Sequence, residues 1–373
     1  MRIGIDANPI FRNRGGVGWH IYHLVRALLD LKDDLEFVCY VEPGALRRRD
    51  SETIEEWEQD PRLTWVEVGR FTRRWRGTLD RLDLYHGMNF RMRTAGRYGG
   101  VVTIHDLWLD RHPQYSTKLF GQRGSFHRTR RTAWRARKVI TVSEHSAQDI
   151  VSLYGVPRER ITVVYNGVSD QFRPVGYPSA LEEIRARLGL PTERFILFAG
   201  GADPRKNHQT LIRAYARVAE LLGGHSLVMV GEASHRFGNI YETARTFGLE
   251  DRVSCPGPLS VEDLGLLYSC ADVFVFPSIY EGFGMPVLEA MACGAPVITS
   301  KTTALPEVAG DAAVLVDPVH VEELADAIVR VLDDQDLRES LRAKGFERVK
   351  RFTWEQAARR TLKVYRQVCS QKP

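Results

Sequence analysis

Cysteine is scarce in this sequence, with five cysteines in 373 residues. No two of them stand in the C-x-x-C spacing that is typical of structural zinc sites and dithiol redox motifs. Their odd number and scattered positions also argue against a disulfide framework and indicate reduced, mostly buried thiols in a cytoplasmic protein. The five positions are Cys39, Cys255, Cys270, Cys293 and Cys369.

Long apolar runs are missing as well. No stretch approaches the ~18 consecutive apolar residues of a transmembrane helix, so none is predicted. The N-terminal sequence MRIGIDANPI has no basic segment leading into an apolar one, and we therefore expect no signal peptide. The composition, 43% hydrophobic and 27% charged, is that of a globular chain, and its length predicts two domains with separate cores.

Positive and negative charges are unevenly distributed along the chain. Residues 1–175 contain 29 Lys and Arg against 21 Asp and Glu, a net charge of +8. Residues 176–373 contain 23 against 26, a net charge of −3. A basic half of this kind predicts that the first domain faces an anionic partner.

Short apolar segments alternate with helical patterns along both halves of the chain. Apolar residues three and four apart predict a helix over 19–31, for example, and prolines with fading periodicity indicate a linker at 168–180. Near-continuous apolar strands that alternate with helices predict two doubly wound parallel α/β sheets, each covered on both faces. The expected strands are 2–7, 35–41, 63–68, 82–87, 101–107, 138–143, 195–201, 225–232, 252–257, 271–278, 295–300 and 312–318.

The segment EGFGMPVLEAMACGAPV, Glu281–Val297, places two carboxylates on either side of a glycine-bearing turn. Pro286 suits the first turn of a helix, and Gly294 suits the left-handed position after the helix ends. The turn then lies at the carboxyl edge of a parallel sheet, where free N–H groups at the helix start attract phosphate. Carboxylates beside a phosphate are best explained as acceptors for hydroxyl groups on either side of it. This predicts a nucleotide-sugar ligand, although Glu281 or Glu289 taken alone is as readily a solvated charge.

The Glu-x7-Glu spacing with its internal G-F-G resembles the retaining glycosyltransferases of family 4, which have the two-domain GT-B fold. The similarity extends over nearly the whole chain, through GGVG, VSEHSAQDI, VYNGVS, GGADPRKNHQTLIRAY and PSIYEGFGMPVLEAMACGAPVI. It implies that Glu281 contacts donor-sugar hydroxyls near the reacting carbon and that Glu289 binds the ribose. We expect the donor to contact the turn itself as well, at Gly282, Phe283, Gly284, Met285 and Val287.

The resemblance also implies a domain arrangement. Two Rossmann-like domains are expected to face each other across a cleft. Residues 1–175 would bind the acceptor and residues 190–353 the nucleotide-sugar. We expect the last helix, over 354–373, to pack back on the first domain.

Arg205 and Lys206 follow the first strand of the second domain, in GGADPRKN. Two cations at the carboxyl edge of that sheet could neutralise a diphosphate and stabilise charge on a leaving group, and the similar family uses the equivalent pair for the donor phosphates. The alternative is a solvated basic turn. With these cations no metal or other cofactor is expected, and the D-x-D spelling at Asp334 and Asp336 is interpreted as solvated surface.

His105 and Asp106 end the strand VVTIHDL and are expected to point into the interdomain cleft. A lone histidine is more often structural, but an HD pair after this strand commonly lines the sugar and acceptor site in the similar family. This favours His105 as functional, with Asp106 a weaker acceptor-side candidate. The nearby NRGGVGW stretch fails the G-x-G-x-x-G fingerprint. Gly16 and Gly18 are instead expected to let backbone amides approach the donor phosphate or the acceptor, the alternative being a flexible turn.

The stretch Gln122–Lys138 contains six Arg and one Lys without an acidic residue. It could rest on an anionic membrane surface, hold a lipid-linked diphosphate acceptor, or form a solvated basic face paired with acids elsewhere. Arg128, Arg131 and Arg135 are the candidates for the first two roles. No nucleic-acid motif accompanies the charge, so nucleic acid is not an expected partner.

Together with the resemblance, these features predict a glycosyltransferase that moves a hexose from a nucleotide-sugar to a hydroxyl of a glycan or lipid-linked acceptor, and the resemblance implies that the configuration is retained. GADPRKNHQTLIRAY is most similar to mannosyltransferases of bacterial cell-surface polysaccharide synthesis, which implies GDP-mannose, although UDP-sugar enzymes share every catalytic motif named here. A nucleotide-sugar epimerase would need an acid–base pair acting on the sugar ring, and none stands out. The broken glycine fingerprint disfavours an NAD-dependent oxidoreductase, and a nucleic-acid or membrane-binding module rests on the arginine-rich stretch alone.

Overall fold

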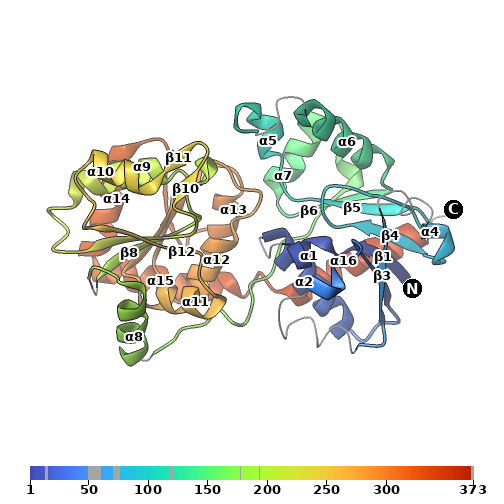
Figure 1. Cartoon of the computed structure of the whole chain (residues 1–373), viewed down its shortest axis with the longest axis horizontal. Coiled ribbons are helices and arrows are strands. Elements are labelled where there is room, and N and C mark those ends of the chain that lie inside the picture. The colour runs from blue at the N-terminus through green and yellow to red at the C-terminus, as the bar shows by residue number, and fades with distance from the viewer. Residues whose placement is uncertain are drawn as a thin grey trace. The chain divides into compact units, whose positions relative to one another are not determined.

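The chain folds into two compact α/β units (Figure 1). Unit 1 comprises Met1–Gly167 and Thr353–Pro373, and unit 2 comprises Val168–Phe352. The division falls at Gly167, earlier than residue 175, so the segment expected as a linker belongs to unit 2. The computed structural model describes residues 1–12, 16–48, 60–69, 76–116, 121–176, 178–192 and 194–370.

Unit 1 is built on a parallel sheet. Seven strands of the described residues form it, in the order β3-β2-β1-β4-β5-β6-β7, and each neighbouring pair is parallel. The strand order reverses between β1 and β4, which is the switch point of a doubly wound fold. The strands are β1 (Arg2–Asp6), β2 (Glu36–Val41), β3 (Leu63–Glu67), β4 (Leu84–Gly87), β5 (Gly100–Ile104), β6 (Lys138–Thr141) and β7 (Ile161–Val163).

Helices cover both faces of this sheet (Figure 1). They are α1 (Asn8–Arg12), α2 (Gly16–Asp30), α4 (Arg76–Leu79), α5 (Trp108–Arg111), α6 (Gly121–Arg135), α7 (Glu144–Asp149) and α16 (Trp354–Cys369). The successive residues Val101 and Val102 of β5 belong to different hydrophobic clusters, as the alternation of side chains along a strand requires. Val101 shares its cluster with α2 and α16, and Val102 shares its own with α6 and α7. The last helix of the chain is therefore part of unit 1.

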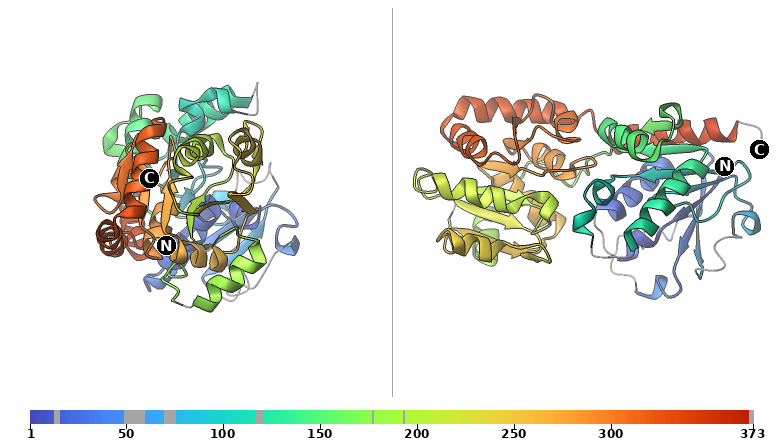
Figure 2. Two further views of the ribbon diagram at one scale, coloured as in Figure 1. Left: turned by 90° about the vertical axis from the view of Figure 1, so that its left-hand side faces the viewer. Right: turned by 90° about the horizontal axis from the view of Figure 1, so that it is seen from above.

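Unit 2 repeats this architecture around a second parallel sheet, with helices on both sides (Figures 1 and 2). Six strands of the described residues form it, in the order β12-β9-β8-β13-β14-β15. They are β8 (Phe195–Ala199), β9 (Ser226–Val230), β12 (Val253–Gly257), β13 (Val273–Phe276), β14 (Val297–Ser300) and β15 (Val314–Val316), with β10 (Ser234–His235) and β11 (Gly238–Asn239) in a separate hairpin. The helices are α8 (Pro178–Leu188), α9 (His208–Val218), α10 (Ile240–Thr246), α11 (Val261–Cys270), α12 (Met285–Ala292), α13 (Leu305–Ala309), α14 (Val321–Asp333) and α15 (Gln335–Val349).

The expected strands are all present, and the differences concern short or polar segments. Strand β7 and the hairpin β10–β11 are two or three residues long per strand, too short to show a period in the sequence. The expected linker is docked on α11: the Val175 N–H donates to Ser269 Oγ at 3.2 Å, and the Phe172 ring lies 6.0 Å from that of Tyr268. In the described part of the chain, each helix falls short of the length or hydropathy needed to cross a membrane.

Candidate functional site

The turn between β13 and α12 is shaped by two glycines and a proline. Gly284 precedes the helix with a left-handed φ of 107°, Pro286 stands in the first turn, and Gly294 follows the helix end with a φ of 85°. The predictions for Pro286 and Gly294 are confirmed. Gly284 is required for a second reason, because a Cβ there would lie 2.6 Å from Leu305 Cδ2 of α13.

Fewer groups at the start of α12 are accessible to a ligand than the sequence suggests. The Phe283 side chain is 4% exposed and its ring lies 5.8 Å from that of Phe352, so it belongs to the core. Val287 is fully buried, and its N–H donates to the Gly284 carbonyl at 3.0 Å. Its side chain and its N–H are thus both engaged within unit 2, and a donor contact at Val287 stays a prediction. Pro286 has no N–H, which leaves Met285 as the residue of this first turn that can present one.

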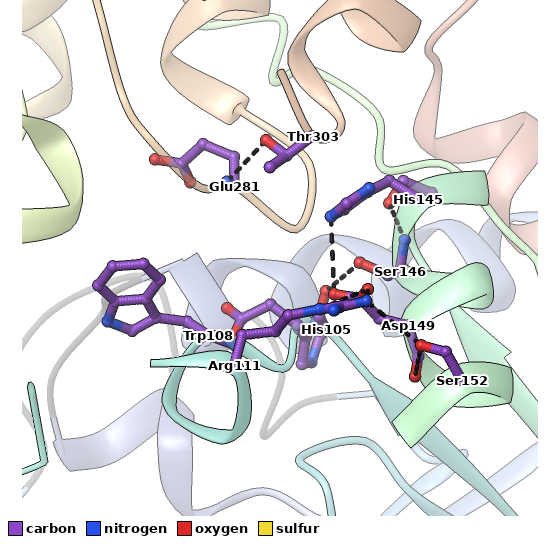
Figure 3. A network of polar contacts seen from close by, with 11 residues as sticks. His105, Trp108, Arg111, His145, Ser146, Asp149, Ser152, Glu281 and Thr303 are labelled. Carbon is purple, nitrogen blue, oxygen red and sulfur yellow. Dashed lines mark hydrogen bonds and ion pairs between the residues drawn. The ribbon is translucent and has the colours of Figure 1, made fainter. Parts of the chain in front are cut away.

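Glu281 lies in the loop before α12 and is buried, with 6% of its surface exposed. Its Oε1 accepts from Lys206 Nζ and from Ser278 Oγ, both at 2.7 Å. Its backbone N–H donates to Thr303 Oγ1 at 3.1 Å, which orients the loop (Figure 3). Burial alone would raise the pKa of this carboxyl, but Lys206 and Arg205 outweigh it and hold the pKa below the ordinary value. Glu281 is therefore a fixed, ionised carboxylate at neutral pH.

Lys206 and Arg205 stand on a 3-10 turn, Pro204–Lys206, directly after β8. Asp203 caps this turn by accepting the Arg205 N–H at 2.9 Å. The Lys206 Nζ forms an ion pair with Glu281 and also lies 4.8 Å from the centre of the Phe276 ring. Burial lowers the pKa of Lys206, and the Glu281 carboxylate opposes that shift. The structure thus brings Arg205, Lys206 and Glu281 together at the carboxyl edge of the sheet, as the sequence predicts.

Glu289 lies within α12 in a different environment from Glu281. The Tyr268 hydroxyl donates to Glu289 Oε2 at 3.3 Å. Burial raises the pKa of Glu289 to about 7, and the Tyr268 bond and Lys206 only partly offset this rise. The two glutamates of the motif therefore differ in charge state near neutral pH.

His105 stands at the carboxyl end of β5 in unit 1 and is 8% exposed. Its Nε2 lies 2.9 Å from the Met88 carbonyl, which can only accept, so Nε2 carries the proton and Nδ1 is left as an acceptor in the neutral ring. Burial lowers the pKa of His105, so the neutral form prevails at pH 7. The neighbouring Asp106 accepts the Trp108 N–H at 3.1 Å and so shapes the start of α5.

Contacts from α7 and from α2 fix the position of His105. The Ser146 hydroxyl of α7 donates to the His105 carbonyl at 3.1 Å, and Arg111 of α5 donates through Nε to the buried Asp149 of α7 at 3.0 Å (Figure 3). From α2, the His20 ring meets the His105 ring edge-on with centres 4.6 Å apart. His20 Nδ1 is itself 2.8 Å from Asn166 Oδ1. His105 is thus in contact with α7 through Ser146 and with α2 through His20.

Gly16 and Gly18 belong to the first turn of α2, with α1 between them and β1. A Cβ on Gly16 would meet no atom within 4 Å, whereas Gly18 is buried. Gly16 thus lies at an open helix start, which suits an approaching ligand.

Most of the arginine-rich stretch lies in α6, and its side chains have two kinds of role. Arg128, Arg131 and Arg135 are exposed. Arg130 and Trp134 instead donate to the Tyr154 carbonyl, at 3.2 and 2.9 Å, and hold the helix on its own unit. Part of this basic stretch is therefore structural.

Comparison with known proteins agrees with this geometry. The Glycosyltransferase Family 4 model matches residues 14–172, and the Glycosyl transferases group 1 model matches residues 181–348. The chain is 32% identical to the O-antigen chain mannosyltransferase B of Escherichia coli, over 76% of this chain and 74% of that protein. It is also 32% identical to the MMP alpha-(1->4)-mannosyltransferase of Mycolicibacterium hassiacum, over 98% of each chain.

The chain belongs to the family 4 glycosyltransferases. This glycosyltransferase is a hexosyltransferase with the GT-B fold. The solved sucrose-phosphate synthase from Thermosynechococcus elongatus shares that fold, with a TM-score of 0.77 at 23% identity over 99% of both chains.

Several supporting residues of the glycosyltransferase escaped the sequence reasoning. Asn207 adopts a left-handed φ of 61° and donates through Nδ2 to the carbonyls of Pro277 and Pro318, at 3.0 and 2.6 Å. It thereby joins the loops that carry Lys206 and Glu281. Asn207 stands in the recognised segment GGADPRKN, but the two carbonyl groups that it contacts are distant in the sequence. Ser278, Thr303 and Tyr268 carry no sequence signal, because their roles depend on contacts between separate loops.

The D-x-D spelling has a local structural role. Asp334 accepts the Leu337 N–H at 2.9 Å and caps α15. Both Asp334 and Asp336 are exposed, as the sequence predicts.

Proposed function

We propose that this glycosyltransferase transfers mannose from GDP-mannose to a hydroxyl of a glycan or lipid-linked acceptor in cell-envelope polysaccharide synthesis. The buried Lys206–Glu281 pair beside the start of α12 carries the assignment of a nucleotide-sugar donor, because it sets a cation and a hydrogen-bond acceptor at one sheet edge. The mannosyltransferases of E. coli and M. hassiacum, similar over most of their lengths, support mannose as the sugar.

Unit 2 would bind the donor through groups already held in place. The diphosphate is matched by the Arg205 guanidinium, the Lys206 ammonium and the Met285 N–H. Glu281 would accept hydrogen bonds from hydroxyl groups of the transferred sugar, and Glu289 would accept them from the ribose hydroxyls. Since each supporting bond is made within unit 2, the site needs little rearrangement to bind a donor.

The transfer proceeds with retention of configuration in this proposal. The bond between the sugar C1 and the diphosphate oxygen breaks, and the acceptor oxygen bonds to C1 from the same face. The acceptor proton passes to the departing diphosphate, whose negative charge Arg205 and Lys206 stabilise. The neutral His105, with Nδ1 as acceptor, would orient a sugar or acceptor hydroxyl. The residues of this site supply the phosphate-binding charge, so no metal ion enters the proposal.

The exposed arginines of α6, Arg131 and Arg135 among them, would let the enzyme rest on the anionic inner face of a membrane. Clustered surface arginines attract anionic headgroups by roughly 1 kcal/mol each. Such peripheral contact would bring a lipid-linked acceptor to unit 1.

Thermal-shift measurements test the donor assignment. GDP-mannose, UDP-glucose, UDP-GlcNAc and NAD would each be added to the full chain. A ligand at ~100 times its Kd stabilises by ~2.7 kcal/mol, and we expect this for GDP-mannose. If a UDP-sugar raises the melting temperature and GDP-mannose does not, the donor assignment changes to that UDP-sugar. If NAD alone raises it, the transferase proposal is refuted.

Two substitutions test the residue roles. We expect Glu281→Gln to abolish transfer while nucleotide binding survives, because the amide keeps the shape but not the charge. Glu289→Ala should weaken binding of GDP itself, measured by calorimetry. Unchanged GDP affinity in Glu289→Ala would remove its ribose role.

A further inference from the structure

The His20 side chain of α2 is buried, 3% exposed, and the function proposed above does not use it. Its Nδ1 lies 2.8 Å from Asn166 Oδ1. Because an amide oxygen can only accept, Nδ1 carries the proton and Nε2 is the acceptor of the neutral ring. Burial lowers the pKa of His20 well below its ordinary value, so the ring is neutral at pH 7.

The other ring nitrogen of His20 is a buried acceptor. Among the residues that the structure describes, no donor forms a hydrogen bond with His20 Nε2. A buried acceptor without a hydrogen bond costs stability, and apolar side chains in place of both His20 and Asn166 would avoid that cost. Packing therefore accounts for the size of the His20 side chain but not for its imidazole.

The imidazole of His20 contacts the ring of His105 directly. The two rings are nearly perpendicular, at 84°, and their centres are 4.6 Å apart. Phe90 is a second aromatic neighbour of His105, with ring centres 5.6 Å apart, and the Met88 carbonyl lies on His105 Nε2. Two rings and one hydrogen bond thus restrict the His105 ring, and Nδ1 remains its acceptor.

The backbone of Phe90 is held in an unusual conformation beside His105. Its φ is 58°, which is an outlier for a bulky side chain. The Phe90 N–H donates to the Thr103 carbonyl at 3.0 Å, which secures this conformation. Backbone strain of this kind persists where the surrounding structure enforces it, and it is concentrated at functional sites. The strain therefore supports a functional requirement on the orientation of His105.

Asn166 provides a fixed anchor for the His20 ring. Asn166 is itself buried, and the next residue, Gly167, packs so closely on the start of α16 that a Cβ there would lie 2.2 Å from the Trp354 nitrogen. The Trp354 ring also lies 5.8 Å from the His20 ring. A hydrogen bond and an aromatic contact therefore fix the orientation of His20 independently of His105.

We propose that His20 is a positioning residue for the transfer reaction: anchored by Asn166, it holds the His105 ring so that Nδ1 points toward the reacting hydroxyl. The inference rests on the proposed function, in which His105 orients a hydroxyl of the sugar or of the acceptor. Displacing a reacting group by about 1 Å can cost roughly a hundredfold in rate. A ring that is loosened but still bonded to Met88 should cost less, about tenfold in kcat.

A double-substitution cycle separates positioning from folding. Transfer from the donor that binds is measured for His20→Gln, for His105→Gln and for the variant with both changes. Glutamine keeps a donor toward Asn166 but removes the ring. We expect His20→Gln to lower kcat about tenfold while the KM for the donor changes less than about twofold, and to have no further effect where His105 is already glutamine.

Nitrogen-15 NMR of the histidine rings tests the same contact without the transfer reaction. The signal of His105 is identified as the one that is missing from His105→Gln. In the wild type it should show a proton on Nε2 and none on Nδ1. His20→Gln removes the neighbouring ring and Asn166→Leu removes the anchor, so each should give a mixture of the two tautomers or a broadened His105 signal.

His23→Gln is the matched control, because His23 lies about one turn along the same helix and stacks on Trp354 with ring centres 5.3 Å apart. This variant removes a contact between α2 and α16 and should leave the His105 signal unchanged. Melting curves verify that each variant is folded, and Asn166→Leu still tests the proposal if His20→Gln does not fold.

Three results would overturn the proposal. The first is an equal loss of kcat from His20→Gln with and without His105, which would assign His20 to folding alone. The second is an unchanged His105 signal in both His20→Gln and Asn166→Leu, and the third is an equal disturbance of that signal by His23→Gln. If no nucleotide-sugar acts as a donor, the proposed function fails, and the NMR comparison still decides whether His20 holds the His105 ring.

Discussion

Replacing Lys206 with methionine should destabilise unit 2 by an amount that depends on pH. Lys206 Nζ lies 2.7 Å from Glu281 Oε1, and the two side chains are 13% and 7% exposed. Methionine approximates the aliphatic part of lysine but leaves the Glu281 carboxylate buried without its nearest cation. Removing one partner of a buried pair costs ~3–5 kcal/mol, and we expect the lower end, ~3 kcal/mol at pH 7, because Arg205 also favours the charged form.

The sign of the pH dependence follows from the pKa of Glu281. In the wild type this pKa lies below the ordinary value of 4.5, so the carboxylate contributes stability above pH 4.5 that is lost as the pH falls through the lowered value. Without Lys206, burial dominates and raises the pKa, so stability is lost as the pH rises through the raised value. The difference between variant and wild type should be small near about pH 4 and should grow toward pH 7, by ~1.4 kcal/mol per unit between the two pKa values.

The two units can be followed separately in the full chain. All seven tryptophans fall within the ranges of unit 1, so tryptophan fluorescence reports that unit, whereas far-UV circular dichroism reports both. Urea unfolding of Lys206→Met should shift the dichroism transition and leave the fluorescence transition in place. Lys344→Met, which removes a lysine 47% exposed in the same unit, is the control and should change stability by ~0.5 kcal/mol or less. An equal loss at pH 4 and pH 7, or a shift in fluorescence, would refute the reasoning.

Three other predictions concern single side chains. Gly284→Ala should lower the urea midpoint of unit 2, followed by circular dichroism, by more than Gly248→Ala does. Gly284 has both a left-handed φ and a crowded Cβ position, whereas Gly248 has a φ of 64° with open space around its Cβ position. Glu289→Gln should flatten the stability of unit 2 between about pH 5 and pH 7, since a pKa raised to about 7 makes the wild type lose stability as the pH rises through that range; an unchanged slope would contradict the burial of its charge. His105→Gln should reduce kcat by at least tenfold with little effect on GDP affinity, and equal loss of both would assign His105 to folding rather than to the reaction.

Much of the fold could be predicted from the sequence because its strands are apolar on both faces. Strands such as β8 and β9 are buried along their whole length, which gives runs that stand out from the amphipathic helices between them. The docked segment before α8 could not be predicted in the same way. Its prolines and polar residues indicate a linker, and the contacts of Phe172 and Val175 with α11 depend on residues almost a hundred positions away.

The site could be predicted where its charged residues directly follow a recognisable strand. Arg205, Lys206 and Glu281 follow two strands that are adjacent in the sheet, so position after a strand was enough to bring them together. The backbone of α12 was not predictable to the same degree. Pro286 and Gly294 were placed correctly. The hydrogen bond from the Val287 N–H to the Gly284 carbonyl, however, can be seen only in the folded loop.

Within the Glu-x7-Glu spacing, environment separates two identical side chains. Glu281 lies against Lys206 with Arg205 nearby, and its carboxylate stays ionised in spite of burial. Glu289 lies about one turn into α12 with a tyrosine hydroxyl as its partner, and burial raises its pKa to about 7. A pair of carboxyl groups whose pKa values are pushed apart is suited to two different roles at one site. A charged group best stabilises positive charge that develops at a sugar carbon, whereas a group that is half protonated near neutral pH can both accept and donate toward the hydroxyls of a ribose. The spacing therefore places one carboxyl in direct contact with a lysine, and the other where burial outweighs the more distant effect of that lysine.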